Sequence, residues 1–224
     1  MTAEPAFAPI PFRSEDIRPC LDRLAILYVE MDRSYEETAR HYGFVCNGCN
    51  DNCCRSLFFH HTIVECLYLV DGFRRLPLAD RRVILEKAAA MSGATLQGTC
   101  PLLLDGRCSL YPFRPMICRL HGIPHEIRFP GRPPSHHPGC AAFESCLSTP
   151  SDRRLDRTPH YTALAELEKD VRTSLGFHSR IHLTIAQILT TFTAWMDRID
   201  RSTDPTMDAP EDSKDPERSD RRRT

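Results

Sequence analysis

Cysteine is the residue type in this chain whose spacing points to chemistry. Eight of the eleven cysteines fall into two blocks and one later position. They are Cys46, Cys49, Cys53 and Cys54, then Cys100, Cys108 and Cys118, and finally Cys140. Four thiols so close together cannot all face one hydrophobic core, because neighbouring side chains point in different directions in any regular structure. The spacing therefore predicts a site for a metal ion or an iron–sulfur cluster.

Disulfide bonds are the main alternative use of these thiols. The first 18 residues show no charged segment followed by an apolar one, and apolar runs elsewhere are too short to span a membrane. We therefore expect a cytoplasmic protein with no membrane contact, in which thiols stay reduced. A chain of 224 residues can also bury a core without covalent staples. Metal binding is the favoured interpretation.

The spacing leaves the identity of the metal open between iron and zinc. A Cys-x2-Cys turn serves zinc and iron–sulfur sites alike. Adjacent thiols such as Cys53 and Cys54 rarely share one tetrahedral ion, so we expect more than one metal ion. The surplus of thiols over the four that a closed zinc site needs slightly favours a cluster and a redox role. It disfavours a zinc hydrolase, whose metal keeps an open position. The alternative is a zinc-stabilised structural or interaction module without catalysis.

The elements that must position these thiols are predicted to be mainly helical. Apolar residues recur at helical spacing, so we expect an irregular small α-rich domain with a short β-hairpin and a cysteine-rich metal-binding centre. The expected helices cover 14–31, 35–42, 57–73, 78–91, 161–175 and 183–196. Gly43 is predicted to end the second of them in a left-handed conformation. The segment 122–139 contains too many Pro and Gly residues for a long regular element.

A two-residue turn is predicted between the cysteines of the second block. Asp105-Gly106 favours a tight hairpin in which Leu103 pairs with Cys108. Cys100 would then face the opposite side, but Pro101 has no N–H for a ladder. We therefore expect the strand to break at Pro101 and Cys100 to turn back toward the site.

Other cysteines and the histidines have simpler interpretations. Cys20 and Cys66 lie on apolar helical stripes and are predicted to be core residues rather than ligands. His60 and His61 would open the helix over 57–73, where at most one of them can face a metal. Several histidines after Cys118 are expected to be exposed loop residues: His121, His125, His136 and His137. Cys140 is the weakest ligand prediction, and Cys146, His136 or His137 would be its natural substitute.

Two motifs carry a family resemblance. The runs CNGCNDNCC from Cys46 and CPLLLDGRCSLYPFRPMICR from Cys100 resemble the YkgJ-type cysteine-cluster family of bacterial zinc- or iron-chelating domain proteins. The resemblance covers about Cys46 to Cys140, with three residues rather than two between Cys49 and Cys53. It implies a metal-chelating domain and no particular reaction.

Two arginines and a tyrosine of the second motif have physical interpretations of their own. Arg114 and Arg119 could offset thiolate charge and donate hydrogen bonds to sulfur, or they could be ordinary ion-pair or capping residues. Tyr111 is expected to pack beneath the site.

Composition sets the remaining limits. With 26% charged residues and a formal net charge of -1, the chain is predicted to be a soluble globular protein. Of its 29 basic residues, all but Lys87, Lys169 and Lys214 are arginine. These arginines are spread out and balanced by acids, so no nucleic-acid binding is expected. We expect a flexible lead-in over 1–13, one domain over 14–200 and a disordered tail over 201–224.

Overall fold

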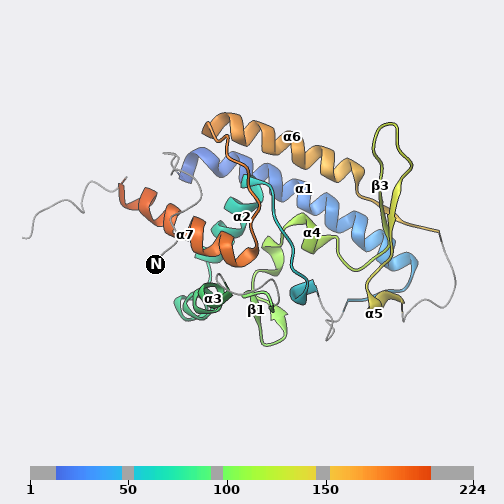
Figure 1. The fold of residues 1–224 in the computed structure, drawn as a ribbon, viewed down its shortest axis with the longest axis horizontal. Coiled ribbons are helices and arrows are strands. Elements are labelled where there is room, and N and C mark those ends of the chain that lie inside the picture. The colour runs from blue at the N-terminus through green and yellow to red at the C-terminus, as the bar shows by residue number, and fades with distance from the viewer. Residues whose placement is uncertain (1–13, 47–52, 92–97, 145–151, 203–224) are drawn as a thin grey trace, which may run out of the picture.

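The protein is mainly α-helical, as the computed structural model shows for residues 14–46, 53–91, 98–144 and 152–202 (Figure 1). The longer helices are α1 (Ser14–His41), α2 (Ile63–Arg74), α3 (Leu78–Met91), α6 (Thr158–Leu175) and α7 (Ile185–Ser202). The short helical turns are α4 (Met116–Arg119), α5 (Ala141–Glu144) and two 3-10 helices, Cys53–Arg55 and Tyr111–Phe113. The strands are β1 (Leu103–Leu104), β2 (Arg107–Cys108), β3 (His125–Ile127), β4 (Ser135–His137) and β5 (Leu155–Asp156). The predicted lead-in and nearly all of the predicted tail lie outside the described residues.

Helix α1 joins two stretches that the sequence analysis treats as separate helices. It runs unbroken from Ser14 to His41, because the residues between the two predicted stretches include no Gly or Pro that could interrupt it. Gly43 follows with φ of +63°, which confirms the predicted left-handed stop. This stop turns the chain out of the helix just before the first cysteine block.

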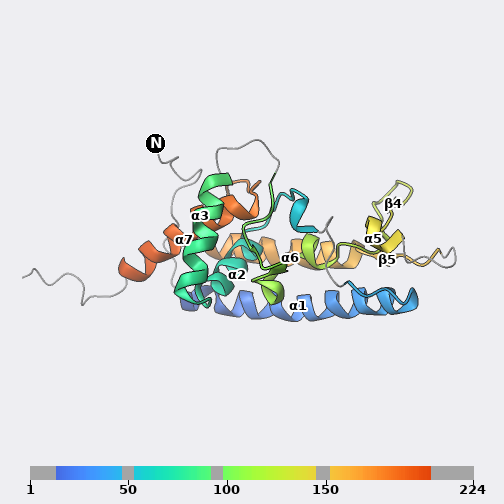
Figure 2. The same ribbon diagram turned by 90° about the horizontal axis from the view of Figure 1, so that it is seen from below.

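The core lies between α1, α2, α6 and α7. Helix α6 lies beside α1 along much of its length, and α2 contacts α1, α6 and α7 (Figures 1 and 2). Leu67, Leu69 and Val70 of α2 are completely buried, so α2 is the central helix. Helix α3 packs on α7 and begins and ends where predicted. Among the described helices, none has a long enough apolar stretch to cross a membrane.

The prediction that α2 begins near Leu57 is wrong. The helix begins at Ile63, because His60 instead forms an antiparallel β-bridge with Leu183. His60 N donates to Leu183 O at 2.8 Å, and Leu183 N donates to His60 O at 3.1 Å. Leu183, more than a hundred residues away, thus pairs with the backbone N–H and C=O of His60 that an earlier start of the helix would use.

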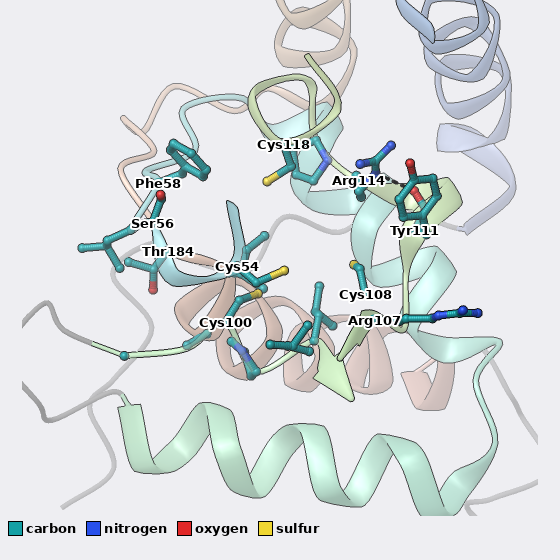
Figure 3. Close-up of a pocket in the computed structure, with 18 of the residues that line it drawn as sticks. Cys54, Ser56, Phe58, Cys100, Arg107, Cys108, Tyr111, Arg114, Cys118 and Thr184 are labelled. Carbon is teal, nitrogen blue, oxygen red and sulfur yellow. Dashed lines mark hydrogen bonds between the residues drawn. The ribbon is translucent and has the colours of Figure 1, made fainter. Parts of the chain in front are cut away.

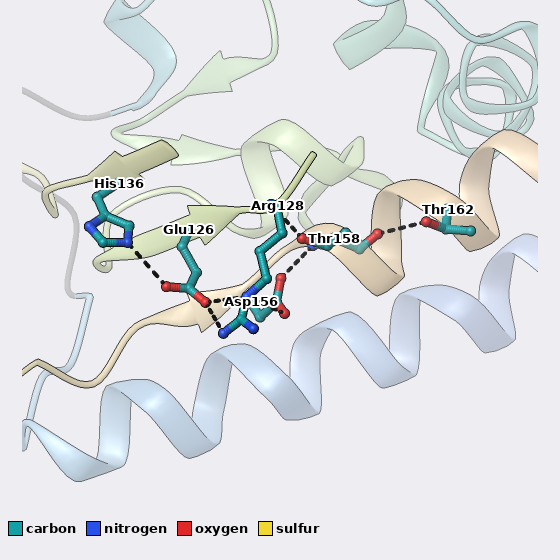
Figure 4. Close-up of polar contacts among 6 residues, drawn as sticks. All are labelled: Glu126, Arg128, His136, Asp156, Thr158 and Thr162. Carbon is teal, nitrogen blue, oxygen red and sulfur yellow. Dashed lines mark hydrogen bonds and ion pairs between the residues drawn. The ribbon is translucent and has the colours of Figure 1, made fainter. Parts of the chain in front are cut away.

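The segment 122–139 forms two short strands of a small sheet, although its many Pro and Gly residues predict no long regular element. Strand β3 pairs antiparallel with β4 and parallel with β5. Arg128 Nη2 contacts Glu126 Oε1 at 2.5 Å, and His136 Nε2 lies 3.4 Å from Glu126 Oε2 (Figure 4). The backbone N–H of Arg128 donates to Thr158 Oγ1 at 2.8 Å. The first two contacts join residues within the sheet, and the hydrogen bond to Thr158 attaches the sheet to the start of α6.

Candidate metal centre

One cavity of about 560 Å³ collects five of the eight predicted ligands. Its lining includes Cys46, Cys54, Cys100, Cys108 and Cys118. These cysteines come from the segment after α1, from the first 3-10 helix, from the β1–β2 hairpin and its entry, and from α4. Figure 3 shows Cys118 approaching from the side opposite Cys54 and Cys100. The fold therefore brings both cysteine blocks to one place.

A backbone hydrogen bond joins the two cysteine blocks directly. Cys100 N donates to Cys54 O at 2.6 Å, and Leu103 N donates to Cys100 O at 3.0 Å. The chain therefore turns tightly at Pro101 and carries Cys100 back toward the first block, as predicted. The register of Leu103 with Cys108 is confirmed as well.

The hairpin turn has the backbone conformation that its sequence favours. Asp105 has φ of 47° and Gly106 has φ of 76°, the positive values of a type I′ turn. This local chemistry places Cys108 opposite Leu103 without help from the rest of the fold.

Cys140 lies apart from the cavity lining. Its N–H donates to Gly122 O at 3.0 Å, and its carbonyl accepts from Phe143 N and Glu144 N of α5. The hydroxyl of Tyr35 of α1 and the thiol of Cys140 both lie beside Gly122. Burial, followed by nearby Cys46, Tyr111 and Cys140, raises the pKa of the Tyr35 hydroxyl. The Tyr35 hydroxyl therefore stays protonated beside Cys140.

Three further predictions fall outside what the structure describes. Cys49 and Cys146 lie outside the described residues, and for Cys53 only the backbone is described. Within the described part of the chain, no three His, Cys, Asp or Glu side chains are placed so that they could hold an ion together. The five thiols share a cavity but do not converge on one point.

The two predicted arginines occupy different environments. Arg114 lines the cavity, donates from Nε to Tyr111 O at 3.0 Å and lies 3.5 Å above the Tyr111 ring. Arg119 is 5% exposed and is not among the lining residues. Its Nη1 contacts Asp32 Oδ2 at 2.5 Å, and its guanidinium lies over the ring of Tyr28. Arg119 therefore braces α4 against α1.

Two other lining residues were missed or misplaced by the sequence analysis. Tyr111 is 58% exposed at the cavity, whereas it was expected to pack beneath the site. Arg107, on the opposite side of the hairpin turn from Leu104, is exposed and also lines the cavity. Its place in the sequence directly before the predicted ligand Cys108 was the one sign that Arg107 would lie near the site. Two arginines thus line the cavity, although the Arg107 side chain extends away from the cysteine sulfurs in the view of Figure 3.

The chemistry of the lining suits soft metals. Among the described lining residues there is no carboxylate and no histidine, and the rest is mostly apolar. The apolar members include Leu57, Phe58, Met91, Leu102 and Ile185. Thiolates select zinc, copper(I) and iron–sulfur clusters over hard cations. The donor set thus fits a thiolate-bound metal, and the arginines could offset its negative charge.

The predicted core cysteines lie away from this cavity. Cys66 is completely buried and burial raises the pKa of its thiol, so it stays protonated. Cys20 is half-buried on α1, and burial raises the pKa of its thiol too. Neither lines the cavity.

We expect Cys20→Ala and Cys66→Ala to leave the metal content per chain unchanged. Cys66→Ala should cost about 1–2 kcal/mol of unfolding free energy, because it leaves a small void in α2. Elemental analysis of purified protein, with unfolding curves on the same samples, gives both quantities. Loss of a whole metal equivalent from either folded variant would place that cysteine among the ligands.

The histidines that follow Cys118 are not placed to bind at the cavity. His121 packs edge-on against Phe58, with ring centroids 5.4 Å apart. His125 and His137 stack across β3 and β4 at 4.7 Å, and His136 faces Glu126. None of these histidines is among the lining residues. His125, His136 and His137 belong to the small sheet, whereas His121 lies between α4 and β3. The prediction that all four are exposed loop residues is wrong for His121 and His125, which are half-buried.

Acid should destabilise the fold through His125. Burial, followed by nearby Arg157, lowers the pKa of His125 to about 4 from 6.5. Because the folded state holds this ring neutral, its contribution to stability is complete above pH 6.5. The contribution is lost progressively as the pH falls from 6.5 toward 4.

We therefore expect His125→Gln to show a smaller fall in Tm over this pH window, by about 2–4 °C. His178→Gln is the matched control, because His178 is exposed. Thermal unfolding from pH 7 to pH 4.5 measures the difference. Equal acid sensitivity of His125→Gln and the parent protein would contradict the assignment.

Comparison with known proteins adds no relative to this description. No protein-family model matches the sequence, and no curated protein or solved structure is significantly similar to the chain.

Proposed function

We propose that this protein is a cytoplasmic metal-binding protein whose cysteine cluster holds an iron–sulfur cluster and serves a redox or electron-transfer role. The observation that carries the proposal is the cavity lined by five cysteines from separate segments. Packing of a hydrophobic core does not explain five cysteines around one cavity, because core cysteines such as Cys66 lie singly on apolar helix faces. The proposal agrees with the resemblance of the two motifs to the YkgJ-type family.

The number of thiols supports iron–sulfur over zinc. A closed zinc site uses four ligands, and the cavity already offers five before Cys49, Cys53 and Cys140 are considered. An iron–sulfur cluster carries negative charge, and its sulfurs accept hydrogen bonds that tune its potential. Arg114 lines the cavity and would offset this charge, whereas the Arg107 side chain extends away from the cysteine sulfurs in the view of Figure 3. When bound, the cluster would supply one-electron chemistry, while the apolar walls would limit access of water.

Zinc stabilisation is the second candidate, and the connectivity of the site favours it. The thiols link three segments that otherwise contain only short regular elements. A zinc ion would hold these loops together, as in small structural zinc domains. In that case the protein would be an interaction module without catalysis.

Anaerobic purification followed by analysis of iron, acid-labile sulfide and zinc separates these candidates. The iron–sulfur proposal predicts brown protein with visible absorption that bleaches on reduction, and matching iron and sulfide. Colourless protein with stoichiometric zinc and no sulfide would support the structural module instead. Protein that takes up neither metal after reconstitution under reducing conditions would contradict metal binding altogether.

A further inference from the structure

The short helix α4, which carries Cys118, is held at both ends by buried charged side chains from other elements. We propose that Glu65 of α2 and Arg157, just before α6, are positioning residues that set the orientation of Cys118 toward the cavity. This inference rests on the proposed function, since it concerns the geometry of one predicted ligand. The contacts that carry it lie outside the cavity itself.

Glu65 holds the beginning of α4. Its Oε1 accepts from Met116 N at 2.7 Å and from Tyr28 Oη at 2.9 Å. Its Oε2 accepts from Thr62 Oγ1 at 2.7 Å. Because Glu65 is only 6% exposed and both oxygens are engaged, its carboxylate has little freedom to move. The first N–H of α4 is therefore tied to the central helix of the fold.

Arg157 holds the end of α4. Its Nη2 donates to the carbonyl of Leu120, the residue that follows α4 and whose own N–H closes the turn onto Met116 O. Arg157 is 3% exposed, and burial lowers the pKa of its guanidinium to about 10. A carboxylate at the start and a guanidinium at the end satisfy backbone groups that a single helical turn leaves unpaired.

The middle of α4 is fixed as well. Arg119 pairs with Asp32 of α1, and its Nη2 donates to Pro112 O at 2.6 Å. Met116 and Arg119 are buried, whereas Cys118 is half-buried and lines the cavity. With its ends and its rear face anchored, α4 presents Cys118 to the cavity in one orientation.

The use of charged residues for this task has an energetic meaning. Burying a carboxylate or guanidinium is costly, and apolar residues of similar size often give equal or greater stability. Charged groups fix direction, however, which apolar packing does not. Side chains that orient metal ligands typically change metal affinity by about 10–100-fold when they are replaced.

A double-mutant cycle with Co²⁺ as the probe tests this role. Glu65→Gln keeps the size of the side chain but has one acceptor oxygen in place of two. We expect Glu65→Gln to weaken Co²⁺ binding about 10-fold and to reduce the thiolate-to-cobalt charge-transfer band. Cys118→Ser should weaken binding more strongly. In the Cys118→Ser background, Glu65→Gln should cause no further loss of affinity, because the thiol that it positions is gone.

Two more variants distinguish a change in the orientation of Cys118 from a general loss of stability. Tyr28→Phe removes one hydroxyl that orients Glu65 and keeps the ring beneath Arg119, so it should show a smaller effect of the same kind. Asp170→Asn alters a carboxylate of α6 that pairs with Arg23 of α1, away from α4, and it should leave Co²⁺ affinity unchanged.

The outcomes separate this inference from the function on which it rests. Equal losses from Glu65→Gln with and without Cys118 would overturn the positioning role, since the effect would then be general. An unchanged affinity in Glu65→Gln would overturn it as well. If Cys118→Ser alone left Co²⁺ affinity and the charge-transfer band unchanged, Cys118 would not be a ligand, and the proposed metal centre would need a different ligand set.

Discussion

Replacing Cys100 and Cys118 together by serine is expected to abolish metal binding and to lower Tm by about 10 °C relative to the metal-loaded parent protein. The two residues reach the cavity from different elements, the hairpin entry and α4. Their loss leaves Cys46, Cys54 and Cys108 as the described thiols that line the cavity, one fewer than a closed four-ligand site uses. Metal analysis and calorimetry on the same preparations measure both effects.

The control for this prediction is the double variant Cys20→Ala/Cys66→Ala, which removes the same number of thiols away from the cavity. It should keep its metal and show only the cost of a core void. Metal retention by Cys100→Ser/Cys118→Ser would contradict the assignment of the cavity as the metal site.

Removing the metal from the parent protein with a chelator should loosen the cysteine-rich region more than the rest of the fold. Amide exchange should rise more within 98–120 than in α6 and α7, because the first region has short elements whereas Leu167 and Leu189 anchor the latter helices in the core. Uniform exchange over both regions would show that the metal does not order the loops selectively.

Removing the carboxylate of Glu168 is the second large change that we expect, with a loss of about 3–4 kcal/mol of unfolding free energy in Glu168→Ala. This side chain reaches from α6 to the beginning of α2. Its oxygens accept from Ile63 N at 2.8 Å and from Val64 N at 3.0 Å. Ile63 and Val64 are completely buried, and Thr62 gives α2 no side-chain cap. Alanine would therefore leave two buried N–H groups without an acceptor.

Glu168→Gln is the matched variant, and it should lose about 1–2 kcal/mol, because its single amide oxygen can accept from only one of the two N–H groups. Burial raises the pKa of Glu168, although the backbone N–H groups and Arg172 act in the opposite direction. An amide oxygen can still accept one of the two backbone hydrogen bonds that the carboxylate accepts. Denaturant unfolding of both variants measures the difference. Equal losses would show that the charge itself, paired with Arg172, is the main contribution.

Local chemistry in the sequence determined several parts of this protein. Helix α3 was predicted with its observed bounds, because Pro77 directly precedes it and helix-forming residues such as Leu, Arg, Glu and Ala fill it. The type I′ hairpin and the return of Cys100 followed from Asp105-Gly106 and Pro101. Such features depend on backbone preferences of adjacent residues, which the sequence displays directly.

Only the tertiary structure decided where distant backbone groups find their partners. The beginning of α2 depends on the pairing of His60 with Leu183, and the sheet depends on β3 meeting β5. Helix α2 also receives its cap from Glu168 on another helix. No local pattern reports these pairings, because each depends on which of many buried donors and acceptors come together when the helices pack.

The candidate site divides in the same way. The spacing of the cysteines predicted that they would lie near one another, and five of the eight predicted ligands line the cavity. The sequence could not show that Cys140 caps α5 or that Arg119 turns inward to Asp32. Ligand candidates are recognised by residue type and spacing, whereas their orientation is set by buried contacts such as that of Glu65 with Met116. Those contacts exist only once α1, α2 and α4 have packed together.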